Sequence, residues 1–169
     1  MIRPILKYGD DLLNQPARPV TEITPDIQRL VDDMIETMYA APGVGLAAPQ
    51  IGAPFRIFVV DVSMGHDPGG LKVMINPAFV EREGMQLEEE GCLSVPTFNA
   101  TVVRPAKVTV KSLDRHGNAY EQGGTGLLAR ALQHEMDHLD GMLFLDRLRG
   151  IKRDMMVRKI RKLTRAGKW

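Results

Sequence analysis

The stretch His134-Glu135-Met136-Asp137-His138 indicates both the local fold and the chemistry of this chain of 169 residues. It continues a run, 126–133, whose residues are typical of a helix, and Gly141 follows as a helix-ending residue. Because positions i and i+4 lie one above the other on a helix, the two imidazoles can hold one metal ion, with the Glu135 carboxylate beside it to handle protons. Two solvent-facing histidines on an amphipathic helix are the alternative interpretation.

A metal ion held by two histidines needs at least one further protein ligand. Downstream, Phe144 stands where one HExxH pattern has a third histidine, and no glutamate follows Glu135. Asp146 and Asp154 remain on that side, within or near a basic segment. Upstream, Cys92 is the only cysteine of the chain, and a thiolate is a strong ligand for zinc or ferrous iron. Cys92 is therefore the favoured third ligand.

Three motifs together resemble those of the peptide deformylases. They are, in order, Gly43-Val44-Gly45-Leu46-Ala47-Ala48-Pro49-Gln50, Glu90-Gly91-Cys92-Leu93-Ser94 and Gln133-His134-Glu135-Met136-Asp137-His138. The resemblance extends from the region of Leu6 to about Leu148. It implies a hydrolase that removes the formyl group from the N-terminal formylmethionine of nascent peptides and releases formate. It also implies that Cys92, His134 and His138 form the metal site.

The residue types and the resemblance assign further roles. Glu135 is expected to take a proton from water and to return it to the leaving amine. By resemblance, the backbone N–H of Leu93 and the side-chain amide of Gln50 donate to the oxyanion that forms on the formyl group, with the metal assisting. The resemblance favours Fe²⁺ in the cell, while Zn²⁺, Ni²⁺ and Co²⁺ suit the same ligands.

Substrate binding is expected to use the protein backbone. Gly43, Val44 and Gly45 carry little side-chain bulk, so a peptide could pair with them like an added strand. Gly91 is expected to play the same part on the other side. By family analogy, a pocket for the first methionine is lined by Val44, Leu127, Arg130, Ala131 and His134. Arg130 is unusual there: either only its methylene stem faces the substrate, or the pocket rim is more polar than in relatives with an aliphatic residue.

Length and composition predict one domain, 1–169, with 44% hydrophobic and 25% charged residues, and the resemblance implies that this domain is catalytic. No apolar run approaches the roughly 20 residues that span a bilayer, so no membrane association is expected. Residues 1–11 lack the apolar core of a signal peptide, and a single cysteine cannot form an internal disulfide. We therefore expect a cytoplasmic protein, and we expect it to be a monomer.

Basic charge is concentrated in the segment 146–169, which carries ten Lys or Arg and two Asp, a net charge of +8. Residues 1–145 carry a net charge of −7. A helix at roughly 150–165 is predicted by apolar residues at spacings of three to five, namely Ile151, Met155, Met156, Ile160 and Leu163. This helix either covers the core with its apolar stripe or turns a basic face to ribosomal RNA, and the two roles are compatible.

The rest of the sequence predicts an α+β domain. Thr24 can cap a helix that begins at Pro25 and ends before Gly43. Strands are predicted at 56–62, 73–75, 102–103 and 107–113, and after a turn at 114–118. Residues 123–126 are predicted to form a flexible turn before the central helix. We expect antiparallel or mixed sheets packed around the HExxH helix, with one helix near each end of the chain.

Two other functions fit part of the sequence. A peptide-bond metalloprotease also uses HExxH, but the missing downstream ligand and the Cys92 motif argue against it. A non-catalytic protein that binds RNA or the ribosome through its basic segment would leave the combination of Cys92, His134 and His138 unexplained.

Overall fold

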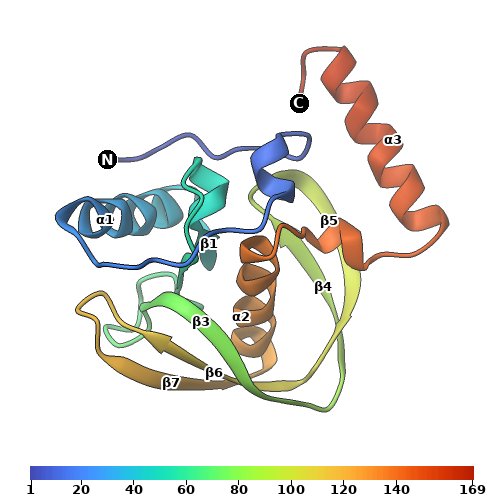
Figure 1. Ribbon diagram of the computed structural model, residues 1–169. Helices are drawn as coiled ribbons and strands as arrows, with labels where there is room; N and C mark the ends of the chain where they lie inside the picture. Colours follow the sequence, from blue (N-terminus) through green and yellow to red (C-terminus); the bar gives the residue numbers. More distant parts are fainter.

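Helix α2 (Gly126–Leu139) lies at the centre of the computed structural model, which describes all 169 residues, Met1–Trp169. Strands curve around it on two sides, α1 covers one flank and α3 stands at the periphery (Figure 1). This is the predicted α+β arrangement: sheets around the HExxH helix, with one helix before them and one after. None of the helices combines the length and the apolar character that crossing a bilayer requires.

All strand pairs in the two sheets are antiparallel. The larger sheet has the order β1-β2-β3-β6-β7, and β4 and β5 form a separate two-stranded sheet. The strands are β1 (Gly45–Ala47), β2 (Ile57–Val60), β3 (Lys72–Glu83), β4 (Gln86–Cys92), β5 (Val95–Arg104), β6 (Lys107–Leu113) and β7 (Ala119–Thr125). Short 3₁₀ turns occur at Asp11–Asn14, Ala48–Ile51 and Phe144–Arg147.

Helix α1 (Pro25–Ala40) forms as the sequence predicts. The Thr24 hydroxyl accepts a hydrogen bond from the backbone N–H of Ile27, and Pro25 occupies the first helical position, where its missing N–H costs nothing. The whole predicted apolar stripe is buried, namely Ile27, Leu30, Val31, Met34 and Met38. These residues pack against β1 and β2 and place the Gly43–Gly45 segment next to the central helix.

Several strands differ from the prediction: β1 and β4 were not predicted, β5 was predicted only at 102–103, and β3 and β7 run further than expected. Strand β3 runs far beyond the predicted 73–75. Proline has no backbone N–H to donate, but Pro77 lies where the register with β6 shifts between Ile75 and Ala78. No ladder hydrogen bond is therefore lost, and the strand continues. The predicted turn at 123–126 is wrong, since Gly123 and Gly124 continue β7. Leu128 lies 2.8 Å from where a Cβ on Gly124 would be, so glycine lets α2 pack close to the strand.

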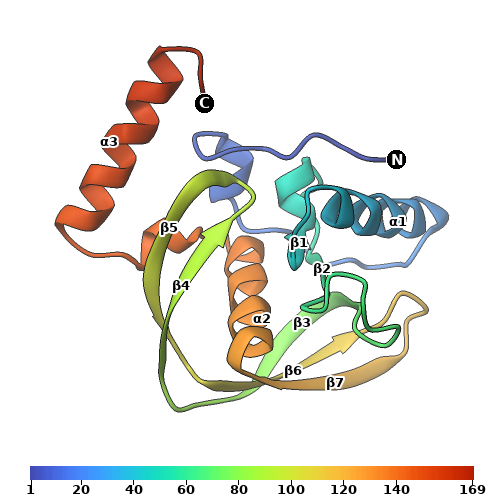
Figure 2. The same ribbon diagram turned by 180° about the vertical axis from the view of Figure 1, so that it is seen from behind.

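Helix α3 (Ile151–Arg165) is confirmed, but its predicted apolar stripe is only partly right. Val157 and Ile160 are the buried residues, while Ile151 is 75% exposed and Met155 52%. At about 100° per residue, Ile151 and Met155 point away from the face that carries Ile160, so the stripe could not pack as one surface. The helix therefore touches the domain through a narrow face and leaves the rest open (Figures 1 and 2).

Candidate metal centre

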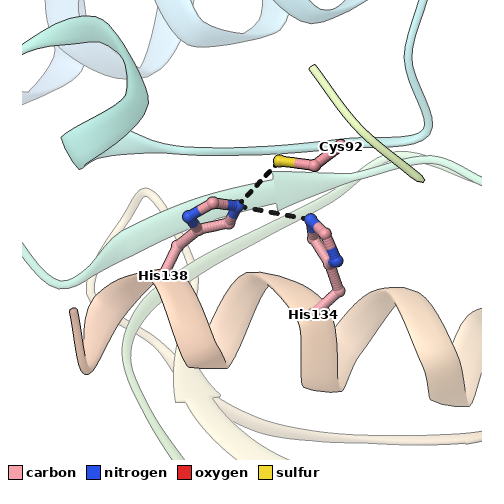
Figure 3. Close-up of side chains that lie close together, drawn as sticks. All are labelled: Cys92, His134 and His138. Carbon is pink, nitrogen blue, oxygen red and sulfur yellow. Dashed lines mark hydrogen bonds between the residues drawn. The ribbon is translucent and has the colours of Figure 1, made fainter. Parts of the chain in front are cut away.

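Cys92, His134 and His138 direct one possible ligand atom each to the same point, and Figure 3 shows the two imidazoles on α2 facing the thiol of Cys92, which lies above them in this view. The three ligand atoms lie within 4.8 Å of one another. His138 Nε2 is 3.3 Å from Cys92 Sγ and 3.2 Å from His134 Nε2. One sulfur and two imidazole nitrogens form a donor set that suits zinc or ferrous iron. Asp146 and Asp154, the other ligands that the sequence allowed, are not part of this cluster.

Each ligand is positioned by local structure. The two histidines are one helical turn apart on α2, and Cys92 ends β4 where the register with β5 shifts. The backbone N–H of Ser94 donates to the sulfur at 3.4 Å, and Gln50 Nε2 lies 3.7 Å from it. These two contacts hold the sulfur in place beside the histidines.

A buried carboxylate fixes the orientation of His134. Glu90 Oε2 lies 2.6 Å from His134 Nδ1, and the guanidinium of Arg104 donates to both oxygens of Glu90 at 2.7 and 2.6 Å. Burial alone would raise the pKa of Glu90, but the hydrogen bonds from Arg104 and His134 lower it well below its usual value. An ionised Glu90 holds the proton of His134 on Nδ1 and leaves the Nε2 lone pair for a metal.

The charge network continues along α2. Arg104 Nη1 donates to Asp137 Oδ2 at 3.0 Å, and Arg147 donates to Asp137 at 2.6 and 3.1 Å. Sequence reasoning missed these supporting residues. The motifs did contain a signal for them. Glu90 and Asp137 lie inside the quoted motifs, and a carboxylate that is buried there needs a positively charged partner.

Arg130 belongs to the same network. Its guanidinium donates to Glu90 Oε1 at 2.9 Å and to the backbone oxygen of Val102 at 2.9 Å, and the residue is 4% exposed. The charged end is thus occupied inside the protein. The methylene stem is the part of Arg130 that is left to border the cavity, and its contact with a ligand stays a prediction.

Glu135 is buried beside the ligand cluster. Burial raises the pKa of this carboxyl to about 7. Its Oε1 atom has no hydrogen-bond partner, and neither has Nδ1 of His138. A Cβ on Gly45 would lie 2.5 Å from Glu135 Oε2, so the carboxylate occupies space that only glycine leaves free. An unpartnered buried oxygen next to three ligand atoms fits a site built to hold a metal ion and a reactant.

The cluster opens into a cavity of about 630 Å³. With the exception of His138, every site residue predicted from the sequence lines it: Gly43, Val44, Gly45, Gln50, Gly91, Cys92, Leu93, Leu127, Arg130, Ala131, His134 and Glu135. His138 is buried behind the others at 1% exposure. The cavity also has walls that sequence reasoning missed, among them Met64 and the β5 residues Pro96, Thr97, Phe98 and Asn99. No local pattern marks these positions, because long-range packing brings them to the site.

Comparisons with known proteins agree with this geometry. The family model described as polypeptide deformylase matches residues 2–154. A peptide deformylase from Acidobacterium capsulatum is 54% identical over 169 residues, which cover 100% of this chain and 99% of that protein. The chain belongs to the peptide deformylase family.

Solved structures of the family share the fold. The crystal structure of a peptide deformylase from Legionella pneumophila has a TM-score of 0.92 at 48% identity, covering 99% of this chain and 98% of that one. The peptide deformylase from Ehrlichia chaffeensis, solved in complex with actinonin, has a TM-score of 0.88 at 39% identity and covers 95% of this chain and 96% of that one. The predicted family and fold are confirmed, and the two alternative functions gain no support.

Within this member of the family, Gln50 is held in one orientation. Its Oε1 accepts from the backbone N–H of Ala47 at 2.9 Å, and its Nε2 donates to Ser94 Oγ at 3.0 Å. Because a backbone N–H requires an acceptor, these contacts place the amide N–H₂ on the side of Cys92. Gln50 is 1% exposed and is one of the residues that line the cavity.

Proposed function

We propose that this member of the deformylase family removes the formyl group from the N-terminal formylmethionine of nascent polypeptides, releasing formate. Cys92, His134 and His138 hold one divalent metal ion, Fe²⁺ in the cell, at a site whose donors also accept Zn²⁺, Ni²⁺ or Co²⁺. The observation that carries the proposal is the meeting of these three ligand atoms with the buried, unpartnered Glu135 oxygen at one cavity. When bound, such an ion acts as a Lewis acid on the formyl oxygen and activates water.

The protein's own groups supply the proton transfer and the oxyanion contacts. Glu135 takes a proton from the attacking water and gives it to the departing amine, and its Oε1 is free of other hydrogen bonds for this purpose. The amide of Gln50 and the backbone N–H of Leu93 donate to the oxygen of the formyl group as negative charge develops on it. Both residues border the cavity beside Cys92.

The peptide is bound mainly through backbone. Gly43–Gly45 and Gly91 line the cavity and leave room for an extended chain to pair there. A Cβ on Gly43 would lie 2.8 Å from Leu93 Cδ1, so a larger residue there would displace the Leu93 side chain. Leu127, Ala131 and the stem of Arg130 form the apolar part that receives the methionine side chain.

The proposed ligand set also bears on the cellular compartment of the protein. The one cysteine is a metal ligand in this proposal, and a thiolate ligand is kept reduced in the cytoplasm.

Hydrolysis of formyl-Met-Ala tests the function. We expect the metal-loaded protein to release formate and free Met-Ala, and to leave the Met–Ala peptide bond intact. Acetyl-Met-Ala is the matched control, because its extra methyl group lies on the carbonyl carbon where the formyl group has hydrogen. Cleavage of the Met–Ala bond would instead identify a metallopeptidase, and no turnover of any formyl peptide would identify a non-catalytic relative.

A second activity is proposed for α3, which binds ribosomal RNA near the exit of nascent chains. The observation in its favour is that most of its basic residues, Lys152, Arg158, Lys159, Arg161 and Lys162, are exposed and form no ion pair. Arg153 is half-buried and lies 3.9 Å from Asp146. Deformylation of a neutral methionine cap does not require this charge, whereas contacts with RNA phosphates do.

Neutralising four of these residues, Arg158, Lys159, Arg161 and Lys162, to glutamine is expected to weaken ribosome binding and to flatten its dependence on salt, because fewer counterions are released. Val157 and Ile160 are kept, so the packing of α3 is preserved. Co-sedimentation with ribosomes at two salt concentrations measures the effect, and Arg82→Gln with Lys111→Gln is a control on the sheet. Equal affinity of the four-residue variant and the unchanged protein would contradict the proposal.

A further inference from the structure

Trp169, the only tryptophan of the chain, packs against Phe98, one of the residues that line the active-site cavity. Its ring meets the edge of Phe98 with 5.9 Å between centroids and 64° between planes. Its indole Nε1 donates to the backbone oxygen of Tyr8 at 2.8 Å. In both views the chain after α3 turns back from the helix toward the N-terminal segment (Figures 1 and 2). Trp169 thus has a defined position although it lies far along the chain from both partners.

Both partners of Trp169 are joined to the site. Phe98 is one of the residues that line the cavity, so Trp169 packs against a residue of the wall that a peptide meets. Tyr8 donates its backbone N–H to the oxygen of Ser94 at 2.8 Å, and Ser94 in turn accepts from Gln50 at 3.0 Å. The wall segment next to them is constrained as well, because Thr97 holds a positive φ of 71°, unusual for a residue that is not glycine. Trp169 therefore packs against β5 next to a residue whose backbone conformation is restricted.

We propose that Trp169 is a positioning residue: by packing on the Phe98 ring it holds this residue of the cavity wall, and with it the β5 wall segment, in place and so sets the affinity for the formylated peptide. This rests on the proposed deformylation. The effect falls on binding rather than on chemistry. Phe98 has no group that can transfer a proton, and the only polar atom of the indole is engaged by Tyr8. Without the indole, Phe98 gains freedom to turn, and the wall must be reordered each time a peptide binds.

Steady-state kinetics of the metal-loaded protein with formyl-Met-Ala-Ser test this role. Trp169→Ala is expected to raise KM about two- to tenfold, the range that an aromatic pair of this kind supports, with kcat unchanged. Trp169→Phe keeps a ring against Phe98 and is expected to restore most of the loss. Lys168→Ala, exposed and adjacent in sequence, is the matched control and should behave like the unchanged protein.

A double-mutant cycle shows whether Trp169 acts through Phe98. The variant that combines Trp169→Ala with Phe98→Ala is expected to have no higher KM than Phe98→Ala alone, because the second change removes a support whose target is already gone. Trp169 also gives the only indole fluorescence, which is expected to shift when the product peptide Met-Ala-Ser saturates the cavity. Additive KM increases would contradict action through Phe98.

The outcomes separate this inference from the function on which it rests. Normal turnover by the unchanged protein with an unaltered KM in Trp169→Ala overturns the role of Trp169 alone. A fall in kcat and in melting temperature that Trp169→Phe does not rescue assigns Trp169 to stability and also overturns it. Absence of formate release by the unchanged protein overturns the proposed function and this inference together.

Discussion

Replacing Cys92 by alanine is expected to abolish tight metal binding and nearly all deformylation. The thiol is one of three ligand atoms, and the two histidines that remain make a poor site for a divalent ion. His134→Ala and His138→Ala should have the same result, because each also leaves two ligands. The measurement is metal content after anaerobic purification and dialysis, paired with formate release. The unchanged protein is expected to retain one Fe²⁺ per chain.

His66→Ala and His116→Ala are the matched controls. Both histidines are exposed in turns, so their loss should leave metal content and turnover unaltered. Melting temperatures of all variants without metal show whether a loss of binding is due to unfolding. A Cys92→Ala protein that is fully loaded and normally active would remove Cys92 from the ligand set.

Elements with a local signal could be predicted from the sequence. Helix α1 follows from a cap, a proline and an apolar stripe that lie within 17 consecutive residues, 24–40. Strand β6 begins and ends where the alternation of Lys107–Leu113 predicts, because every second side chain is buried. The i, i+4 spacing of His134 and His138 needs no tertiary information beyond the helix itself.

The β4–β5 hairpin could not be predicted in the same way. Its first strand contains Glu88, Glu89 and Glu90, which resemble a solvated acidic run, and two of the three are in fact exposed. Glu90 is buried because Arg104 and Arg130 reach it from distant parts of the chain. Such ion pairs between separate segments cannot be predicted from a local sequence pattern. The family resemblance, rather than any local pattern, likewise pointed to Gln50 and Leu93.

Glu135→Gln is expected to retain the metal ligands and to lower turnover by about 10²–10⁴-fold, the contribution of a positioned acid–base group. Glutamine has nearly the size of glutamate, so it can occupy the space beside Gly45, but it cannot accept a proton from water. The measurement is kcat for formyl-Met-Ala at matched metal content. Glu121→Gln is the control, since it makes the same chemical change on the exposed side of β7.

Stability distinguishes a catalytic role of Glu135 from a structural one. The carboxyl is 3% exposed and one of its oxygens has no partner, so its charged form is costly to bury. A neutral amide removes that cost, and the melting temperature of Glu135→Gln should equal or exceed that of the unchanged protein. A residue kept for structure would show the reverse, a lower melting temperature on replacement. Near-normal turnover in the fully loaded variant would rule out Glu135 as the proton carrier. Low turnover together with undiminished stability would show that the protein retains a costly buried carboxyl for its chemistry.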